Sequence, residues 1–576
     1  MFDTSTRGRM KTSKNILGAL TMTVGAFVST ATTADTDAEF TKCSLPYIRS
    51  LAPGDTTVAS AKIVSDPVSH CMVEGYVTTV DPGPNQVNFA LHLPAEEKWN
   101  KRYYFANQGG SGGSIPIEAQ HPQGNPLNAG FAWAGTDKGH SRSGNVGVSG
   151  DWEKDPAKVL DNAHRGAHVV TVAAQHITKA YYDVDHMYRY AGGCSGGGGM
   201  SQAAVQHHPH DYDGVMMGGM PVGVPPDPRK QRQFEHAMMV QESLREPGSW
   251  LSPAKREFAA AEVMQACDAN DGALDGVIWD SRLCEFDFNT LACDGEDETT
   301  CLTRPEITTI ENLLRDSNMP ISSIDQWGYM GMIPPEEWDN ESGFKAFGYT
   351  LTKGWIATHL NQPDRDLRKH PLTRDEMWQI MVGRAKPSGQ GPYGNVGWEG
   401  FEKAGGKLIY FTGEGDPCCS AIQSEQFFRD TWELQGRKNV DKFAKLYVIP
   451  GWGHCGGTNG PADAEDRLLT ALIDWVENDK EPLAVVTGRG SPERTNFLFM
   501  GFQDRVERLA TQNGPHLMSQ GVKPPVRDFL LCPFPQMPLF DQTKANDPRA
   551  VYEAGNWSCV SREEYAKALE LTKPFN

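Results

Sequence analysis

Short apolar runs that end in glycine-rich turns recur along this chain, and they set its expected architecture. A run of this length followed by a turn is typical of a buried strand in an α/β sheet. Residues 197–208, which follow the third run, are compatible with a helix. The six apolar runs are at 102–113, 130–141, 186–195, 213–221, 406–417 and 444–455.

This pattern lapses between about 222 and 400, where the chain is rich in proline, tryptophan, cysteine and acidic residues. One sheet interrupted by a large insertion accounts for the gap better than two tandem domains. We therefore expect residues 35–221 and 401–576 to form one α/β domain, and residues 222–400 to form an inserted lid. The 576 residues are enough for a large core.

The N-terminus has the pattern of a secretory signal peptide. A basic segment from Arg7 to Lys14 precedes an apolar segment from Ile16 to Val28, and small residues lead to Ala34. The apolar segment is too short to cross ~30 Å of hydrocarbon, which disfavours the alternative of an anchor helix. We expect residues 1–34 to be removed and the protein to be periplasmic or secreted, without a membrane partner.

Charge and cysteine content refine this picture. The formal net charge of −19 argues against a nucleic-acid partner, because phosphate binding needs clustered lysine and arginine. Twelve cysteines in an exported protein favour disulfides over thiols or zinc ligands. Their connectivity does not follow from spacing alone.

The clearest chemical motif is Gly193-Cys194-Ser195-Gly196-Gly197, a G-x-S-x-G sequence between an expected strand and an expected helix. This is the nucleophile elbow of α/β-hydrolases, in which the serine sits on a tight, strained turn. A Walker A loop would need a lysine, which is missing. A dinucleotide-binding loop suits an exported protein poorly, and a plain glycine-rich turn remains the alternative.

Two further residues follow in the order serine, acid, histidine that this fold requires. Asp416 lies in the loop after the expected strand at 406–412, and His454 lies between glycines after the expected strand at 444–450. We expect Ser195 to attack a carbonyl, His454 to accept its proton and Asp416 to fix the imidazole tautomer. Asp416 as a turn residue and His454 as a structural loop residue are the alternatives.

Both the serine and the histidine have a cysteine neighbour. If Ser195 and His454 meet, Cys194 and Cys455 come close enough for a disulfide, which needs Cα atoms ~5.5 Å apart. Such a bond would join two distant strand ends and hold the nucleophile and base in place.

These features resemble the tannase family, which comprises tannin acyl hydrolases, feruloyl esterases and mono(2-hydroxyethyl) terephthalate hydrolase. The resemblance rests on the cysteine–serine and histidine–cysteine pairs with the intervening acid. It extends through residues 161–221 and through the C-terminal segment 531–559, and it is weakest from about 305 to 400. It implies an α/β-hydrolase fold with a large lid and a small-molecule substrate that is an ester of an aromatic acid.

The oxyanion hole needs two backbone donors. The N–H of Gly196 is expected to be one, because it follows the nucleophile. The second should come from the glycine-rich segment 107–113, and the resemblance assigns it to Gly110, with Gly109 as the alternative. A simple glycine turn is the competing interpretation.

An acidic loop at 267–284 places Asp268, Asp271 and Asp275 close together among glycines. Hard oxygen ligands on a turning backbone suit Ca²⁺, but the spacing is not that of an EF-hand, and the residues alone leave a solvated acidic turn equally open. The resemblance implies a structural Ca²⁺. Its ligands would be the side chains of Asp268, Asp271 and Asp275 and the carbonyls of Ala273 and Val277.

The resemblance also implies four further disulfides. Adjacent Cys418 and Cys419 match no family feature, and the sequence leaves open a vicinal disulfide or two thiols. The implied pairs are Cys43–Cys71, Cys267–Cys284, Cys293–Cys301 and Cys532–Cys559.

Other polar clusters are assigned no chemistry. His207, His208 and His210 are expected to form a solvated helix end rather than a metal site, and the acids of 334–338 are expected to be solvated. Most aromatic residues of the insertion should pack in the lid core, with two or three lining the pocket. They are Trp279, Trp327, Tyr329, Trp338, Phe344, Phe347, Tyr349, Trp355 and Trp378.

The sequence therefore indicates a secreted carboxylic ester hydrolase that acts on hydroxycinnamic or gallic-type esters. Hydrolysis of a terephthalate or phthalate monoester is the alternative. It is weakened because Thr412 stands where the terephthalate enzyme has a pocket histidine, and no lid arginine among Arg365, Arg368 and Arg374 is singled out for the free carboxylate. A catalytically silent binding protein and a nucleotide-binding enzyme are the alternatives from other classes.

Overall fold

The computed structural model describes thirteen stretches of the chain. Contacts divide the chain into Met1–Glu39 and Phe40–Asn576, and all described residues belong to the second unit. The expected signal peptide, 1–34, therefore lies outside the described residues. These are 40–65, 68–116, 126–141, 151–220, 246–296, 299–316, 320–324, 354–367, 369–385, 397–417, 419–457, 459–489 and 526–571.

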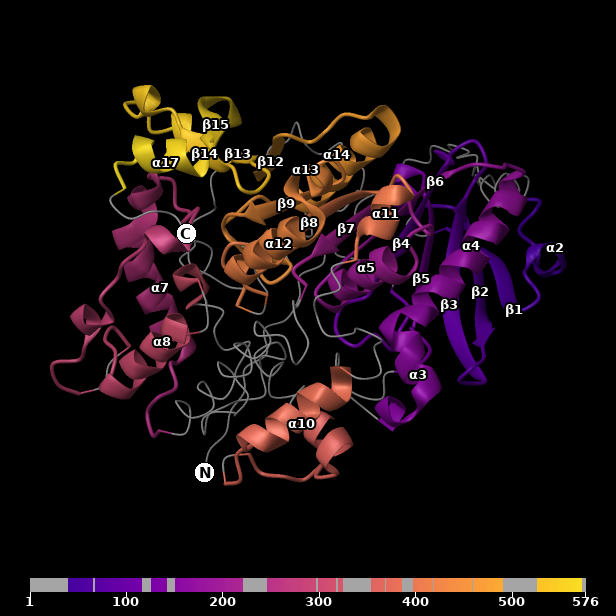
Figure 1. Ribbon diagram of the computed structural model, residues 1–576, viewed down its shortest axis with the longest axis horizontal. Coiled ribbons are helices and arrows are strands. Elements are labelled where there is room, and N and C mark those ends of the chain that lie inside the picture. Colours follow the sequence, from indigo (N-terminus) through magenta and orange to yellow (C-terminus); the bar gives the residue numbers. More distant parts are fainter. Residues whose placement is uncertain are drawn as a thin grey trace, which may run out of the picture. The chain divides into compact units, whose positions relative to one another are not determined.

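A nine-stranded mixed sheet forms the centre of this unit, in the order β1-β2-β3-β5-β4-β6-β7-β8-β9 (Figure 1). The strands from β5 to β9 run parallel, whereas β1, β2 and β3 are antiparallel to their neighbours. The six expected strands are confirmed as β4 to β9. The bounds are β1 Thr56–Val64, β2 His70–Thr79, β3 Asn85–Pro94, β4 Arg102–Ala106, β5 Ala132–Thr136, β6 Tyr188–Cys194, β7 Gly214–Gly218, β8 Lys407–Gly413 and β9 Ala444–Ile449.

The parallel strands bring the candidate site together. The carboxyl ends of parallel strands meet at one edge of a sheet, where ligands bind in open α/β folds. The loops after β4, β6, β8 and β9 carry Gly110, Ser195, Asp416 and His454 respectively. Residues separated by more than 300 positions in the chain thus share one edge.

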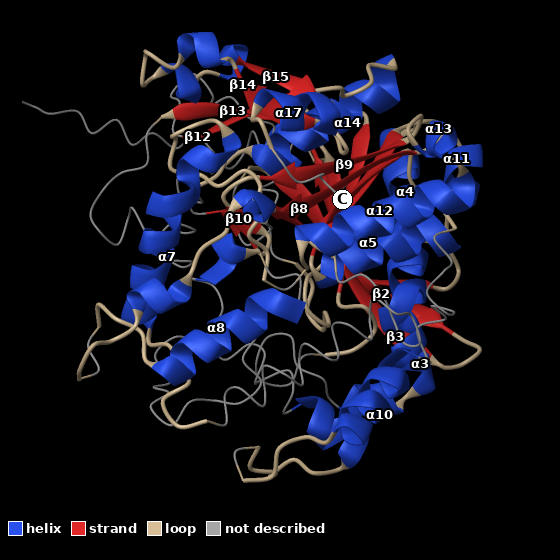
Figure 2. Ribbon diagram, turned by 60° about the vertical axis from the view of Figure 1, so that its left-hand side comes forward, coloured by secondary structure: helices blue, strands red, loops and turns tan. Residues whose placement is uncertain are grey.

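Strand residues alternate between two hydrophobic cores, as the period of two requires. Tyr103 and Phe105 face one core, whereas Tyr104 faces the other. The first core is covered by α4 (Gly166–Tyr182), α5 (Gly196–His207) and α12 (Ala421–Gln435), which lie together on one face of the sheet (Figure 2). The opposite face is covered by α14 (Ala464–Asn478).

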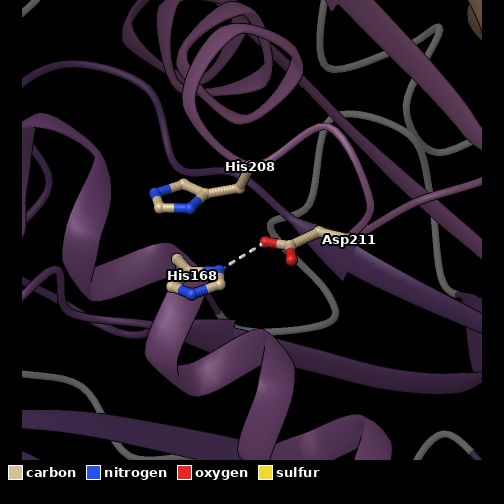
Figure 3. A group of neighbouring side chains, drawn as sticks. All are labelled: His168, His208 and Asp211. Carbon is tan, nitrogen blue, oxygen red and sulfur yellow. Dashed lines mark hydrogen bonds and ion pairs between the residues drawn. The ribbon is translucent and has the colours of Figure 1, made fainter. Parts of the chain in front are cut away.

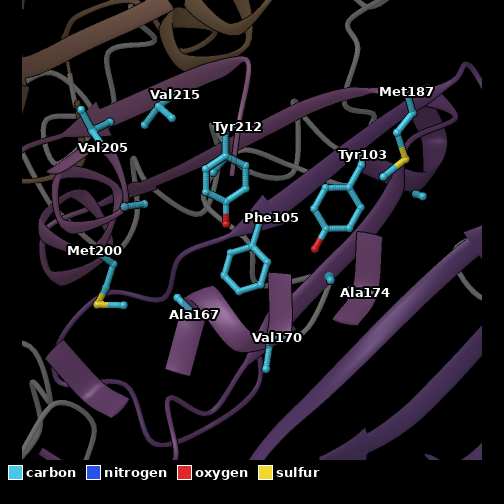
Figure 4. Packing of buried hydrophobic residues seen from close by; sticks show 14 of the residues in the cluster. Tyr103, Phe105, Ala167, Val170, Ala174, Met187, Met200, Val205, Tyr212 and Val215 are labelled. Atoms are coloured by element: carbon cyan, nitrogen blue, oxygen red, sulfur yellow. The ribbon is translucent and has the colours of Figure 1, made fainter. Parts of the chain in front are cut away.

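Helix α4 shows why these faces pack. Its buried residues Ala167, Val170, Ala174, Ile177 and Tyr181 recur at spacings of three and four, which places them on one helical stripe. Figure 4 shows part of this stripe against Tyr103, Phe105 and Tyr212 of the sheet side.

The remaining helices are short or belong to the insertion. Within the part of the chain that the structure describes, no helix combines the length and hydropathy needed to cross a membrane. Their bounds are α2 Leu45–Leu51, α3 Pro156–Leu160, α7 Pro253–Cys267, α8 Arg304–Asp316, α10 Arg374–Ala385, α11 Glu399–Lys403, α13 Arg437–Val440 and α17 Arg562–Ala568.

The insertion has its own core, formed largely by α7, α8 and the segment 277–292. A C-terminal segment packs on it (Figure 1) through a separate cluster that joins Val277 and Trp279 to Phe529 and Trp557. This segment contains paired short strands rather than part of the main sheet. Its pairs are β12 Val485–Arg489 with β13 Arg527–Leu531 and β14 Met537–Phe540 with β15 Trp557–Val560, while β10 Trp452–Gly453 and β11 Gly456–Gly457 pair in the loop after β9.

Candidate active site

Ser195 occupies the turn between β6 and α5. Its backbone has φ 61° and ψ −123°, in the region of positive φ that a serine rarely adopts. The turn is held from both sides, since Ser195 N–H donates to the Gly218 carbonyl at 2.9 Å and the Ser195 carbonyl accepts from Gly199 N–H at 3.0 Å. This strained geometry presents the side chain at the edge of the sheet, as the motif predicts.

The two outer glycines of the motif are required by close backbone approach. A Cβ atom at Gly193 would lie 2.4 Å from the Asn107 carbonyl oxygen, and one at Gly197 would lie 2.3 Å from the same oxygen. Any side chain at either position would push the loop after β4 away from the serine. Asn107 also donates from its side-chain amide to Ser201 Oγ at 3.0 Å, which ties this loop to α5.

Asp416 and His454 lie in contact at the ends of β8 and β9. The Nδ1 atom of His454 is 2.9 Å from Asp416 Oδ2 and 3.1 Å from Oδ1. Asp416 is fully buried, and it also accepts a hydrogen bond at Oδ1 from Cys419 N–H at 2.9 Å. A carboxylate in this position fixes which imidazole nitrogen carries the proton, leaving Nε2 as the acceptor.

A disulfide joins the neighbours of Ser195 and His454. Cys194 and Cys455 have Cα atoms 5.9 Å apart although 261 positions separate them. Cys455 has φ 60°, so the loops at both ends of the bond turn sharply. Within the described part of the chain Ser195 Oγ forms no hydrogen bond to His454, and such bonds are often loose in enzymes without substrate.

The loop after β4 lies directly on the nucleophile elbow. Gly110 has φ 60°, and a Cβ atom at Gly196 would lie 2.0 Å from the Gly110 carbonyl oxygen. A Cβ atom at Gly109 would lie 3.9 Å from that of Ser195. Both segments expected to supply oxyanion donors are thus in mutual contact, beside the serine.

Two charged residues that the sequence did not single out support these loops. The buried Lys138 donates from Nζ to the Gln108 carbonyl at 2.9 Å, which holds the loop after β4. Glu414 lies two positions before Asp416 and accepts from Ser281 N–H at 2.9 Å and Ser322 Oγ at 2.6 Å. Burial raises the pKa of Glu414. Ser281 and Ser322 belong to the insertion, so Glu414 links the acid loop to it.

The three aspartates of the acidic loop are buried and turn towards their own backbone. Asp268 accepts from Asp275, Gly276 and Val277 N–H groups, and Asp271 accepts from those of Ala273 and Trp279. Burial, with the Asp275 charge as a lesser cause, raises the pKa of Asp268 to about 6. Burial and the Asp275 charge raise the pKa of Asp271 well above its usual value.

Among the described residues, one cation pairs with these three aspartates. Arg527, from the C-terminal segment, binds Asp275 Oδ2 at 2.6 Å, and neither Asp268 nor Asp271 forms an ion pair with any described residue. Three buried carboxylates and one guanidinium leave two negative charges uncompensated if all three carboxylates are ionised. A divalent cation with oxygen ligands fits this set.

The structure forms five disulfides among the described cysteines, and they are the five expected pairs. Cys418 lies outside the described residues, so a bond between it and Cys419 is not addressed, and Cys419 is buried. The pairs are Cys43–Cys71, Cys194–Cys455, Cys267–Cys284, Cys293–Cys301 and Cys532–Cys559.

The structure agrees with some of the predictions made for the other polar and aromatic residues and differs from others. His207 and His210 are exposed, as a solvated helix end should be, but His208 is half-buried and stacks on His168. Arg365 binds Glu376 at 2.7 Å, whereas Arg368 and the acids of 334–338 lie outside the described residues. Among the insertion's aromatics, Trp279 is buried with Phe529, whereas Trp355 and Trp378 pack at the edge of a small cluster. The others, at 327–349, also lie outside the described residues.

Sequence comparisons find one family across most of the chain. A family model described as tannase and feruloyl esterase matches residues 71–362 and 394–559. A probable feruloyl esterase B-1 from Aspergillus fumigatus is 27% identical over 445 residues, which cover 72% of this chain and 78% of that protein. Feruloyl esterase B from Aspergillus niger is 28% identical over 420 residues, covering 68% of this chain and 75% of that protein.

Solved structures agree on the fold. Feruloyl esterase B from Aspergillus oryzae has a TM-score of 0.68 at 21% identity, covering 91% of this chain and all of that one. The tannin acyl hydrolase from Aspergillus niger has a TM-score of 0.65 at 18% identity, covering 92% of this chain and 96% of that one. The expected α/β-hydrolase fold is confirmed.

Proposed function

The chain belongs to the tannase and feruloyl esterase family and is a carboxylic ester hydrolase, and from this premise we propose that it cleaves esters of hydroxycinnamic or gallic-type acids through an acyl-enzyme. The observation that carries the proposal is the buried Asp416–His454 pair, joined through the Cys194–Cys455 disulfide to the strained Ser195. The aromatic acyl group is inferred from the names of the relatives, which are feruloyl esterases.

In this mechanism Ser195 Oγ attacks the ester carbonyl while His454 Nε2 takes its proton. Asp416 accepts the Nδ1–H of His454 and stabilises the imidazolium that forms. His454 then protonates the departing alcohol, and water enters to release the acid by the reverse sequence of proton transfers. Burial of Asp416 strengthens its hold on the imidazole, because the local dielectric is low.

The oxyanion of each tetrahedral intermediate is bound by the N–H groups of Gly196 and Gly110. Support comes from the direct contact of these two glycines beside Ser195. Removing one donor of this kind typically costs about 3 kcal/mol of transition-state stabilisation. Lys138 keeps the second donor in place by holding the carbonyl of Gln108, two positions before Gly110.

Among the described residues, no observation favours terephthalate monoester hydrolysis. The Thr412 hydroxyl donates to the Cys419 carbonyl at 3.1 Å, so this side chain supports the acid loop rather than a substrate. Arg365, one of the arginines considered for a free carboxylate, already binds Glu376 through two of its nitrogens. This activity is an outcome of the test below rather than part of the proposal.

We further propose that the acidic loop holds a structural Ca²⁺. Its ligands would be the carboxylates of Asp268, Asp271 and Asp275 and the carbonyls of Ala273 and Val277. The excess negative charge of three buried aspartates over one arginine supports this assignment. The ion would supply no chemistry to the ester; it would hold the loop that leads through Ser281 to Glu414.

Export is also part of the proposal. The five disulfides suit an oxidising compartment, and the pattern of residues 1–34 suits a cleaved signal peptide. Periplasmic release and full secretion are both compatible with these features.

A substrate panel tests the function. Initial rates are measured for the wild type and Ser195→Ala on methyl ferulate, methyl gallate, mono(2-hydroxyethyl) terephthalate and a short aliphatic nitrophenyl ester, with circular dichroism as the folding control. We expect serine-dependent turnover of ferulate or gallate far above the aliphatic ester. Preference for the terephthalate or aliphatic ester would contradict the proposed acyl group while leaving the nucleophile in place.

A further inference from the structure

A histidine-rich cluster lies where α4 and the end of α5 meet, apart from the candidate active site and the acidic loop. His168 comes from α4, His208 caps the C-terminal end of α5, and Asp211 lies in the turn that leads to β7. Ligand atoms of these three side chains all lie within 4.8 Å of one another. Figure 3 shows the His208 ring facing the His168 ring, with the Asp211 carboxylate beside them.

The ligand atoms of His168 and Asp211 lie at nearly the distance that separates two ligands of one metal ion. His168 Nδ1 lies 2.8 Å from Asp211 Oδ2. Two ligands of one cation at ~2.1 Å bonds lie about 3.0–3.4 Å apart, depending on the coordination geometry. A cation can therefore replace the hydrogen between these atoms with a shift of a few tenths of an ångström, while the His168 proton moves to Nε2.

His208 is oriented by a fourth residue. Its Nε2 atom lies 3.1 Å from Nδ1 of His164, which precedes His168 by one helical turn. This hydrogen bond occupies Nε2 and leaves Nδ1 of His208 for a cation. A ligand histidine whose other nitrogen is hydrogen-bonded is the usual arrangement at protein metal sites.

The rings are stacked rather than aimed at a common point. The centroids of His168 and His208 are 3.8 Å apart with planes inclined by 6°. The nitrogen lone pairs of stacked rings lie in parallel planes, so uptake of a cation requires the His208 ring to rotate about its Cβ–Cγ bond, and the His164 side chain must move with it for their hydrogen bond to be kept. Both rings are partly exposed, which leaves room for this rotation and a path for the ion.

We propose that His168, His208 and Asp211 form a binding site for a divalent transition-metal cation of the Zn²⁺ or Ni²⁺ type. Two imidazoles and one carboxylate are ligands that such cations prefer, whereas Ca²⁺ takes oxygen ligands. The bound ion ties the end of α5 to α4. Because α5 begins at Gly196, directly after Ser195, the ion stabilises the helix that supports the nucleophile turn.

Zinc stoichiometry tests this proposal. Tag-free protein is stripped with chelator, saturated with Ca²⁺, dialysed against Zn²⁺ and assayed for bound zinc by mass spectrometry. The test variant is His208→Phe, which keeps an aromatic ring on His168 but has no ligand nitrogen. The matched control is His210→Phe, since His210 is exposed on the same turn and outside the cluster. Cys419→Ser tests the second group whose ligand atoms converge, Asp416, Cys419 and His454.

We expect the wild type, His210→Phe and Cys419→Ser each to bind one zinc more per chain than His208→Phe. Zinc should raise the melting temperature of the first three proteins and leave that of His208→Phe unchanged. Co²⁺ should give a d–d absorption spectrum without a thiolate band. Equal zinc content in the wild type and His208→Phe, or loss of zinc in Cys419→Ser alone, would overturn the proposal. Equal melting temperatures of metal-free wild type and His208→Phe show that the variant folds.

Discussion

At the scale of single residues, the hydrogen bond between Asp416 and His454 determines which imidazole nitrogen is ready to accept a proton. Replacing Asp416 by asparagine keeps the shape but offers an amide donor to Nδ1, which favours the wrong tautomer. We expect kcat on methyl ferulate to fall about 10⁴-fold with KM little changed. Steady-state kinetics check this, with thermal melting as the control for folding. A decrease of less than tenfold would mean that Asp416 does not orient His454.

His140 makes stability depend on pH. It is buried, stacks on Trp152 at 4.1 Å between centroids, and has no described hydrogen-bond partner at Nδ1. Burial, with the Lys138 charge, lowers its pKa to about 4. The unfolded chain, with a pKa near 6.5, binds this proton more readily between those values. Stability is therefore complete above about pH 6.5 and is lost as the pH falls towards 4.

The contribution of His140 to the pH dependence of stability can be measured by comparison with His140→Phe, which keeps an aromatic ring stacked on Trp152. Between pH 7 and pH 5 the wild type should lose about 2 kcal/mol more unfolding free energy than the variant. Denaturant unfolding at the two pH values gives this difference. Identical losses in the two proteins would show that the buried imidazole does not set the pH dependence.

Some residues of the candidate site could be identified from the sequence alone, whereas others could not. Ser195, Asp416 and His454 were identifiable because each stands in a glycine-flanked motif in the order this fold requires. Glu414 and Lys138 were not, because a charged residue in a glycine-rich loop is typical of a solvated turn. Their burial arises only when segments distant in sequence fold over them. His168 and Asp211 were missed for the same reason, since more than 40 positions separate them.

At the scale of elements, the Cys194–Cys455 disulfide holds two loop ends that no hydrogen-bonded strand pair connects directly. Replacing both cysteines by serine should lower kcat about 10²-fold, because loss of positioning at the reacting atoms is costly. The control is the matching double substitution at Cys532 and Cys559, which lie in the C-terminal segment. Both variants are compared by kcat and melting temperature. Equal effects on kcat would show that the first disulfide acts only through general stability.

Some strands could be predicted from the sequence, whereas others could not. Strands β4 to β9 are apolar, short and bounded by glycine, so each has a local signal in the sequence. Strand β1 is largely accessible, β2 alternates buried and half-buried positions, and β3 is buried over its second half; none of these three strands was anticipated. The C-terminal strands were missed because their partners include the acidic loop of the insertion, through contacts such as Arg527 with Asp275.

At the scale of the whole molecule, the acidic loop connects three parts of the chain. Arg527 and Tyr565 contact it from the C-terminal segment, while Ser281 at its end binds Glu414 in the loop after β8. Removal of Ca²⁺ by chelation should therefore lower the melting temperature, and added Ca²⁺ should restore it. Calorimetry with and without chelator measures the shift.

Two variants test whether the calcium-dependent rise in melting temperature comes from the acidic loop. Asp271→Asn should abolish the calcium-dependent shift, because it removes one buried carboxylate charge from the loop. Asp294→Asn, at an exposed position of the same insertion, should retain it. A shift of equal size in both variants would place the ion elsewhere, and no shift in the wild type would remove the calcium proposal.

Active-site labelling directly tests the proposal that Ser195 is the nucleophile of an ester hydrolase. The protein is treated with a fluorophosphonate, and the modified residue is identified by peptide mass spectrometry while ester hydrolysis is followed in parallel. We expect one label per chain, on Ser195, with loss of activity in proportion to labelling and no label on Ser195→Ala. Labelling of another residue in step with inactivation, or continued hydrolysis by fully labelled protein, would contradict it.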